Sequence, residues 1–130
     1  MLSLASNVRI FAAREHVDFR KGVDGLCAIV RDQFGDDPLA GHVYVFFNAR
    51  RNKVKILVWD QNGFWLLWKR LELGRFQRIE GASAKVKIDR ARLAMLLDGI
   101  DTKDSKFTRN FVSEVRIAAR DGDQRARSSS

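Results

Sequence analysis

Hydrophobic residues concentrate in three short runs in the middle of the chain. The runs at residues 43–47, 54–59 and 64–71 are rich in β-branched and aromatic side chains, which favour strands. Short polar gaps separate the runs. The second gap, residues 60–63, has the Asp and Gly that a type I turn prefers at its first and last positions. The pattern predicts a three-stranded antiparallel meander over residues 43–71.

The turn at residues 60–63 determines which side chains of the meander share a face. It places Trp59 opposite Phe64, and opposite residues of an antiparallel pair lie on one face. Basic and aromatic side chains then share one face, in the combination that sheets use to neutralise phosphates and stack bases. This face carries Lys53, Lys55 and Arg70 with Trp59, Phe64 and Trp68. The other face is ordinary core, formed by Val54, Ile56, Val58, Trp65 and Leu67.

The first gap, residues 48–52, leaves the register of the first strand open. A five-residue loop places Val45 and Phe47 on the basic face, whereas a four-residue loop reverses them. The gap also carries Arg50 and Arg51 at the predicted hairpin tip, where nothing in the pattern forces them to pair internally.

Two segments outside the meander have the spacing of amphipathic helices. Residues 22–34 carry an apolar stripe at helical spacing and end before Gly35 and Pro38, while residues 89–98 begin at an Asp89 cap. Residues 7–14 and 85–88 are predicted strands. We therefore predict an α+β fold: an antiparallel sheet of four or five strands built on the central meander, with two helices packed on it.

The length of 130 residues favours a single domain, which we place at residues 1–119. Residues 120–130 have nothing to bury and are predicted to form a disordered basic tail. The chain has no apolar run long enough to span a membrane and no secretory signal, so we expect a cytoplasmic protein without membrane contact.

Candidate metal ligands and catalytic groups do not form recognisable patterns. Cys27 is the only cysteine and is expected to be a small buried hydrophobe, while His16 and His42 lie far apart in the sequence. The carboxylates occupy separate predicted loops, with no spacing that brings them together. We predict no catalytic residues, no metal site and no cofactor. These carboxylates are Asp36, Asp37, Asp60, Glu72 and Glu80.

Positive charge is concentrated on the meander. The formal charge of the chain is +8, and residues 48–78 hold eight Lys or Arg against only Asp60 and Glu72. Residues 1–47 hold five basic against six acidic residues. A localised basic surface attracts phosphate backbones and gives salt-dependent binding. A solvated surface that keeps the protein soluble is the alternative reading of the same charge.

The candidate nucleic-acid-binding residues follow from the basic face and the hairpin tip. Trp68, and with it Phe47, would stack on bases, while basic residues contact phosphate; these are Arg50, Arg51, Lys53, Lys55, Lys69 and Arg70. Arg20 and Lys21 precede a helix N-terminus, where a bound phosphate or the carboxylates of Asp18 or Asp24 would offset their charge. It stays open whether the aromatic face is exposed or lies under a helix as a second core layer.

Several motifs follow one another in unbroken order: residues 18–26 (DFRKGVDGL), 41–46 (GHVYVF) with Asn48, Arg50 and Arg51, 55–60 (KILVWD) with Gly63 and Phe64, and 68–71 (WKRL) with Gly74 and Phe76. Together they resemble the IS-sixty-six family insertion-sequence accessory protein TnpB, also called the Orf2-like protein. The resemblance covers roughly residues 1–101, although His16 stands where the family usually has proline.

The resemblance implies a bacterial mobile-element protein encoded beside a separate transposase and needed for movement of the element, with no catalytic residues of its own. We therefore expect a non-catalytic accessory protein that supports DNA transposition by binding nucleic acid, in particular the ends of the element. The alternative is a protein-interaction subunit that docks on the transposase without contacting DNA, because Trp, Phe and Arg also dominate protein interfaces.

Overall fold

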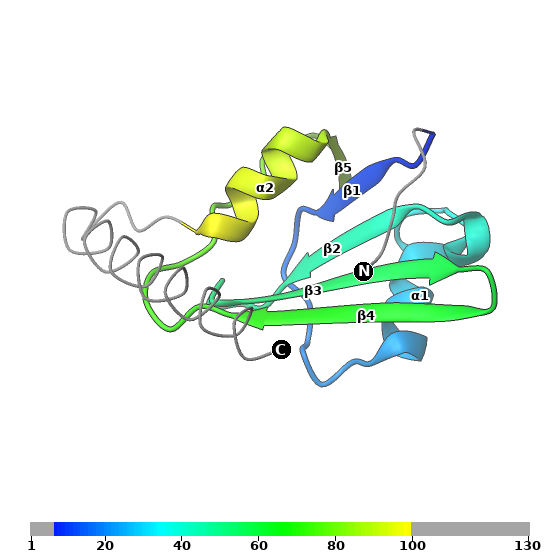
Figure 1. Cartoon of the computed structure of the whole chain (residues 1–130), viewed down its shortest axis with the longest axis horizontal. Coiled ribbons are helices and arrows are strands. Elements are labelled where there is room, and N and C mark those ends of the chain that lie inside the picture. Colours follow the sequence, from blue (N-terminus) through cyan, green and yellow to red (C-terminus); the bar gives the residue numbers. More distant parts are fainter. Residues whose placement is uncertain (1–6, 100–130) are drawn as a thin grey trace, which may run out of the picture.

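The computed structural model describes residues 7–99, which fold into one five-stranded sheet with two α-helices (Figure 1). All five strands overlap predicted ones, with β1 shorter than predicted, and both helices lie where the apolar spacing placed them. In chain order the elements are β1 (Ile10–Ala13), α1 (Val23–Asp32), the short 3-10 helix η1 (Pro38–Ala40), β2 (Val43–Phe47), β3 (Lys53–Asp60), β4 (Gly63–Arg70), β5 (Lys85–Ile88) and α2 (Arg90–Asp98).

The strands are arranged in the order β4-β3-β2-β1-β5. All neighbouring pairs are antiparallel except β1 and β2, which are parallel. The predicted α+β fold and strand number are confirmed, with this one parallel pair as a difference. Its reason is the connection between β1 and β2, which contains α1 and returns the chain to the same end of the sheet.

The β3–β4 hairpin has the predicted register, with Trp59 opposite Phe64, Lys55 opposite Trp68 and Lys53 opposite Arg70. The predicted type I turn is wrong. Only two residues connect the strands, and the first of them, Gln61, has a φ of +56°. Two-residue hairpin loops favour a positive φ because the resulting backbone twist matches that of the strands.

The β2–β3 connection follows the four-residue alternative. Phe47 lies opposite Val54 and Val45 opposite Ile56, so Phe47 is on the apolar face and fully buried. The loop is closed by Asn48, whose Oδ1 accepts hydrogen bonds from the backbone N–H groups of Asn52 and Lys53. The prediction that Phe47 stacks on bases is therefore wrong.

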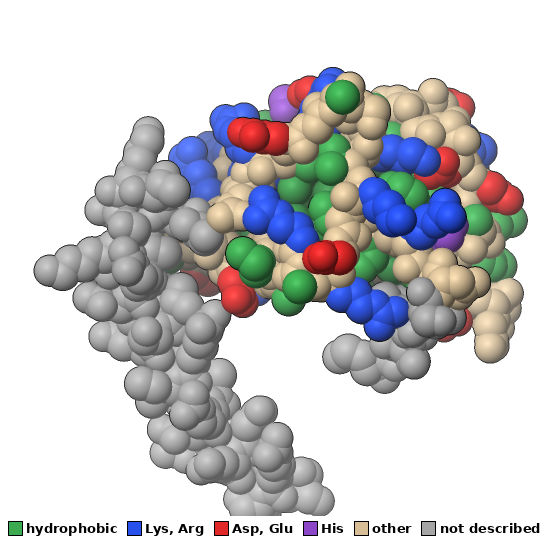
Figure 2. Space-filling view, turned by 90° about the horizontal axis from the view of Figure 1, so that it is seen from above, with side chains coloured by type: hydrophobic (Ala, Val, Ile, Leu, Met, Phe, Trp, Pro, Cys, Tyr) green, Lys and Arg blue, Asp and Glu red, His purple; other side chains and the backbone are tan. Residues whose placement is uncertain are grey.

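The two edges of the sheet differ. β5 has four residues, two of which are lysines, whereas β4 has eight. From above, the side on which β5 and α2 lie, Figure 2 shows charged side chains of both signs among apolar ones. A short, charged edge of this kind disfavours pairing with another chain.

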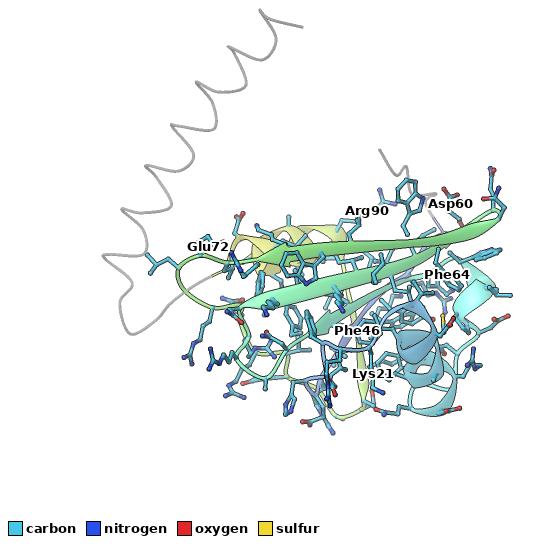
Figure 3. The ribbon with its side chains drawn as sticks, turned by 90° about the horizontal axis from the view of Figure 1, so that it is seen from below. Lys21, Phe46, Asp60, Phe64, Glu72 and Arg90 are labelled. Atoms are coloured by element: carbon cyan, nitrogen blue, oxygen red, sulfur yellow. The ribbon has the colours of Figure 1, made fainter. Side chains whose placement is uncertain are left out.

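The two helices cover opposite faces of the sheet, as Figure 3 shows. α1 packs Leu26, Ile29 and Val30 against a layer that contains Tyr44 and Phe46. α2 packs on the other face, where Leu96 joins the second core layer. The aromatic face of the meander is therefore partly a core layer: Phe64 and Leu66 pack against the α1 layer, while Trp68 remains 54% exposed.

The ends of both helices also agree with the sequence signals. Gly22 is the N-cap of α1, and Gly35 follows the helix with a φ of +69°. Asp89 caps α2 by accepting a hydrogen bond from the backbone N–H of Arg92. Neither helix is long enough or apolar enough to cross a membrane, and no other helix in residues 7–99 is. The predicted tail at 120–130 and the end of the predicted domain at 119 lie outside the described residues.

Candidate nucleic-acid interface

Six of the ten predicted binding residues lie at one end of the molecule, where β3 begins and β4 ends. Lys53 and Arg70 are opposite one another there, and Trp68 lies on the same face. The β1–α1 connection is fastened to this end because the Lys55 Nζ donates hydrogen bonds of 2.8 Å to the backbone carbonyls of both Phe19 and Lys21. We call this region the hairpin-end surface: Arg20, Lys21, Arg50, Lys53, Trp68 and Arg70.

A shallow hollow of about 550 Å³ lies at the hairpin-end surface. Its walls come from two segments that are far apart in the sequence, the β1–α1 connection and the β2–β3 loop. Arg50 and Lys53 supply positive charge, and His16 and Asn48 add further polar groups, beside the ring of Phe19. Asp18 also lines the hollow, and its carboxylate is neutralised by the Arg20 guanidinium. The hollow is chemically suited to an anionic group flanked by a planar one.

Three residues that line the hollow were not among the predicted binding residues: His16, Phe19 and Asn48. Phe19 and Asn48 belong to motifs that carry the family resemblance, which is a signal for their importance but not for their position. Nothing in the sequence indicated that the segment at residues 16–19 lies beside the β2–β3 loop, because that contact depends on the crossover through α1.

Arg51 does not project from the hairpin tip, so the prediction that it lies free there is wrong. Its residue surface is only 7% exposed, and its guanidinium donates hydrogen bonds to the backbone carbonyls of Phe76 and Gln77. The same group lies 4.6 Å from the centre of the Phe47 ring. Burial, and secondarily the charge of Arg78, lowers the pKa of Arg51. Through these hydrogen bonds, Arg51 links the segment after β4 to the β2–β3 loop.

Lys55 and Lys69 also serve the fold. The Lys55 ammonium, besides holding the β1–α1 connection, lies 4.9 Å from the centre of the Phe19 ring. Lys69 is on the opposite face of the sheet from Trp68 and donates a 2.7 Å hydrogen bond to the carbonyl of Leu97, at the C-terminal end of α2. Their contact with phosphate stays a prediction, and both ammonium groups already have internal acceptors.

Arg20 and Arg70 each have an acidic partner. The Arg20 guanidinium forms three side-chain hydrogen bonds with the carboxylate of Asp18, which is the local neutralisation considered as one alternative from the sequence. This hydrogen bonding lowers the pKa of Asp18 to about 2. Arg70 pairs with Glu72 at 2.8 Å. Both arginines remain exposed, so their outer donors can reach a ligand.

The other cations of the surface form no salt bridge among residues 7–99. Lys21 and Arg50 are exposed, Lys53 is half-buried, and none of the three takes part in an ion pair there. Trp68 presents about half of its surface to solvent. Trp59 and Phe64 are half-buried and contact each other edge to face at 5.0 Å, so they contribute less open surface for stacking.

The remaining candidate groups have structural surroundings. Burial raises the pKa of the Cys27 thiol, which lies inside the α1 layer as expected. His42 accepts a hydrogen bond at Nδ1 from the backbone N–H of Arg9. Residues 7–99 hold no group of three or more His, Cys, Asp or Glu side chains arranged for a metal ion. Asp36, predicted only as a loop carboxylate, pairs with Lys85 and accepts a hydrogen bond from the Tyr44 hydroxyl.

Comparison with known proteins gives a consistent set of matches. The family described as "IS66 Orf2 like protein" matches residues 8–107. Two similar proteins come from Sinorhizobium fredii (strain NBRC 101917 / NGR234). "Uncharacterized protein y4hO" is 33% identical over 108 residues, which cover 83% of this chain and 94% of the relative. "Uncharacterized protein y4jC" is 31% identical over 101 residues, which cover 78% and 86%. No solved structure gives a significant match.

Proposed function

This chain belongs to the IS66 Orf2-like family, whose members have an accessory role in an insertion sequence, and from that membership we propose that it binds DNA through the hairpin-end surface. In this proposal the protein is non-catalytic, acts in the cytoplasm, and contacts the ends of its element together with the transposase. The observation that carries the proposal is that Lys21, Arg50 and Lys53 lie on the hairpin-end surface together with Trp68 and form no salt bridge among the described residues.

Each part of this surface has a chemical task in the proposal. Lys21, Arg50 and Lys53 neutralise phosphates, which releases counterions and makes the affinity fall with salt. Arg20 and Arg70 use donors that their carboxylate partners leave available. Trp68 stacks on a base that is unpaired or distorted, as expected near an element end that is being processed. Phosphate contacts give affinity, and Trp68 gives a preference for exposed bases.

A specific observation supports the second candidate, docking on the transposase without DNA contact. Trp65 and Leu67 lie on the face of β4 opposite Trp68 and are 49% and 44% exposed. Large exposed apolar side chains are typical of protein interfaces. Trp65 and Trp68 therefore form a natural pair of probes: they belong to one strand, are similarly exposed and point to opposite faces.

The decisive experiment measures fluorescence anisotropy of the purified protein with three labelled oligonucleotides: the terminal inverted repeat of the element, a scrambled duplex and a single strand. We expect micromolar or tighter binding with a steep negative salt dependence. Trp68→Ala should weaken binding of the single strand by a factor of about 5 to 150, the cost of one lost base stack, whereas Trp65→Ala should leave it unchanged.

The opposite pattern would favour the second candidate. If none of the three oligonucleotides binds at low salt, the hairpin-end surface is not a DNA interface. Loss of transposase binding in Trp65→Ala but not in Trp68→Ala would then assign docking to the α2 side of β4. Unfolding curves of both variants are needed as a check that each folds.

A further inference from the structure

β4 leaves one hydrogen-bonding edge of the sheet open. It is the outermost strand, and within residues 7–99 no other strand pairs with its outer side. Figure 3 shows this edge directly, with Asp60 and Glu72 marking its two ends. Unpaired strand edges are templates for pairing with another chain unless charges, proline, a bulge or a covering segment protect them.

The central part of β4 lacks these protections. Residues 63–68 (GFWLLW) contain no charged residue and no proline, in contrast to the short β5 edge with Lys85 and Lys87. Three of the five large hydrophobic side chains exposed in the described part of the chain belong to β4: Trp65, Leu67 and Trp68. The central part of β4 is thus uncharged and carries exposed apolar side chains on both faces.

The backbone geometry identifies the groups available for pairing. The N–H of Leu71 donates to the carbonyl of Asn52 at 2.7 Å, so it points toward the β3 side. Alternate residues of an antiparallel strand point their N–H and C=O groups to opposite sides. Hence the backbone N–H and C=O groups of four residues point away from β3. These residues lie one, three, five and seven positions before Leu71: Arg70, Trp68, Leu66 and Phe64.

We propose that two copies of this chain pair through β4, antiparallel and with the two-fold axis between the two Leu67 residues, to form one continuous sheet. This register uses all four outward-pointing residues, because Phe64 lies opposite Arg70 of the second copy and Leu66 opposite its Trp68. A two-fold axis perpendicular to the sheet keeps each face on its own side, so residues on one face meet residues on the same face.

The side chains that meet in this register are complementary. On the α1 side, Arg70 meets the Phe64 ring of the second copy, and Leu66 packs against its Trp68. On the α2 side, Lys69 meets the Trp65 ring, and the two Leu67 side chains meet each other. Cations beside aromatic rings and apolar groups in contact are both favourable. The two Leu67 residues form a non-hydrogen-bonded pair, in which side chains approach most closely.

The available area indicates the strength of the association. Trp65, at 49% exposed, leaves roughly 100 Å² uncovered on the α2 side of β4, opposite the face on which Trp68 is proposed to bind a base. Two copies of Trp65 then contribute roughly 200 Å², and Leu67, the cationic side chains and the strand backbones add the remainder toward the roughly 1,200 Å² of a small specific interface. We expect a reversible dimer with a dissociation constant in the micromolar range.

The test measures molar mass by analytical ultracentrifugation over about a hundredfold range of protein concentration. The mass of wild type should rise from 14.9 kDa toward twice that value. Leu67→Lys places two like charges on the axis and should remain monomeric, as should Leu67→Glu. A mixture of the two variants should recover the dimer, because an ammonium and a carboxylate then meet on the axis. Met95→Lys on α2 is the matched control, as Met95 is 53% exposed and lies outside β4.

Each outcome decides the proposal, and none involves DNA. A wild-type protein that is monomeric at every concentration would overturn it and would direct attention to the chain's own residues after 99 as the cover of β4. Equal loss of dimer in Leu67→Lys and Met95→Lys would overturn the β4 interface. Failure of the mixed variants to recover the dimer would overturn the register. Circular dichroism and unfolding curves verify that each variant is folded.

Discussion

Arg50 and Arg51 are neighbours in the β2–β3 loop but have opposite surroundings. Arg50 is exposed beside the hollow, whereas Arg51 is buried against Phe47 and bonded to two backbone carbonyls. Arg51 also has a φ of +56°, which is unfavourable for any residue with a Cβ. The loop therefore adopts a strained conformation that turns one arginine inward and leaves the other for a ligand.

Replacement of Arg51 should destabilise the fold, while replacement of Arg50 should not. Arg51→Ala removes two charge-assisted hydrogen bonds and the contact with Phe47, so we expect a loss of about 2–3 kcal/mol in the free energy of unfolding, against less than about 0.5 kcal/mol for Arg50→Ala. Arg51→Gly loses the same contacts but relieves the positive φ and should be about 1 kcal/mol more stable than Arg51→Ala. Urea unfolding measures all three; an equal loss for Ala and Gly would contradict the role of the backbone conformation.

Asp18 and Arg20 define the conformation of the segment that leads to α1. Hydrogen bonds from the side chain and the backbone of Arg20 lower the pKa of Asp18 from its usual 3.8 to about 2. A carboxyl group with a lowered pKa stabilises the folded state while it is ionised, so this contribution is complete above about pH 4 and is lost as the pH falls through about 2.

The ion pair can be tested by titration of the Asp18 carboxyl carbon in NMR spectra. We expect a midpoint near 2 in wild type and a shift toward 3.8 in Arg20→Gln, with some depression retained because the backbone hydrogen bond from residue 20 persists. Lys21→Gln removes only a weaker electrostatic effect and should move the midpoint less. Identical shifts in the two variants would mean that general positive charge, and not the Arg20 contact, sets the pKa.

At the scale of elements, α2 is held at both ends by specific hydrogen bonds. Asp89 satisfies the N–H of Arg92 at its start, and the ammonium of Lys69 satisfies the carbonyl of Leu97 near its end. Both contacts agree with the helix dipole, because a negative group lies at the N-terminus and a positive group at the C-terminus. Lys69 thereby joins α2 to β4.

Loss of either contact should weaken the fold moderately. We expect Asp89→Ala to cost about 1 kcal/mol and Lys69→Met about 0.5–1 kcal/mol in the free energy of unfolding. The nine-residue helix separates the two sites by about 13 Å, so the losses should add in the double variant. Chemical denaturation measures them, with Lys87→Met as an exposed control expected to change stability by less than about 0.5 kcal/mol. A loss in the double variant well below the sum would contradict independent contacts.

The elements were largely predictable from the sequence because their signals are local. The helix from residue 89 has its cap and leucine spacing in ten residues, and the β3–β4 register followed from the hairpin turn even though the turn class was wrong. The parallel pairing of β1 with β2 was not predictable, because it depends on how the α1 crossover packs on the sheet.

The candidate site was predictable only in composition. The pattern placed Lys55 and Trp68 on one face correctly, but it could not show that Lys55 would meet the carbonyls of Phe19 and Lys21. The hydrogen bonds of Arg51 and Lys69 could not be predicted for the same reason: their acceptors, at Phe76 and Leu97, are more than twenty residues away in the sequence. The sequence shows that a long basic side chain is charged, but it does not show whether that side chain already has a hydrogen-bond acceptor within the fold.

At the scale of the whole molecule, the question is whether total charge or its position governs binding. A protein with a formal charge of +8 attracts polyanions from any side, and such attraction alone gives salt-dependent association. The proposal states in addition that DNA binds at the hairpin-end surface, where Arg50 and Lys53 lie together. Other cations are exposed away from this surface, such as Arg31 on α1 and Lys87 on β5.

Two double variants with equal charge separate these explanations. Arg50→Gln with Lys53→Gln, and Arg31→Gln with Lys87→Gln, each lower the formal charge of +8 by two. If binding is local, the first variant should reduce the slope of log affinity against log salt by about two units and the second should leave it unchanged, because only phosphates in direct contact release counterions. Anisotropy titrations of both variants with the same duplex measure the slopes. Equal reductions would mean that net charge alone attracts DNA, and the hairpin-end surface would then have no specific part in DNA binding.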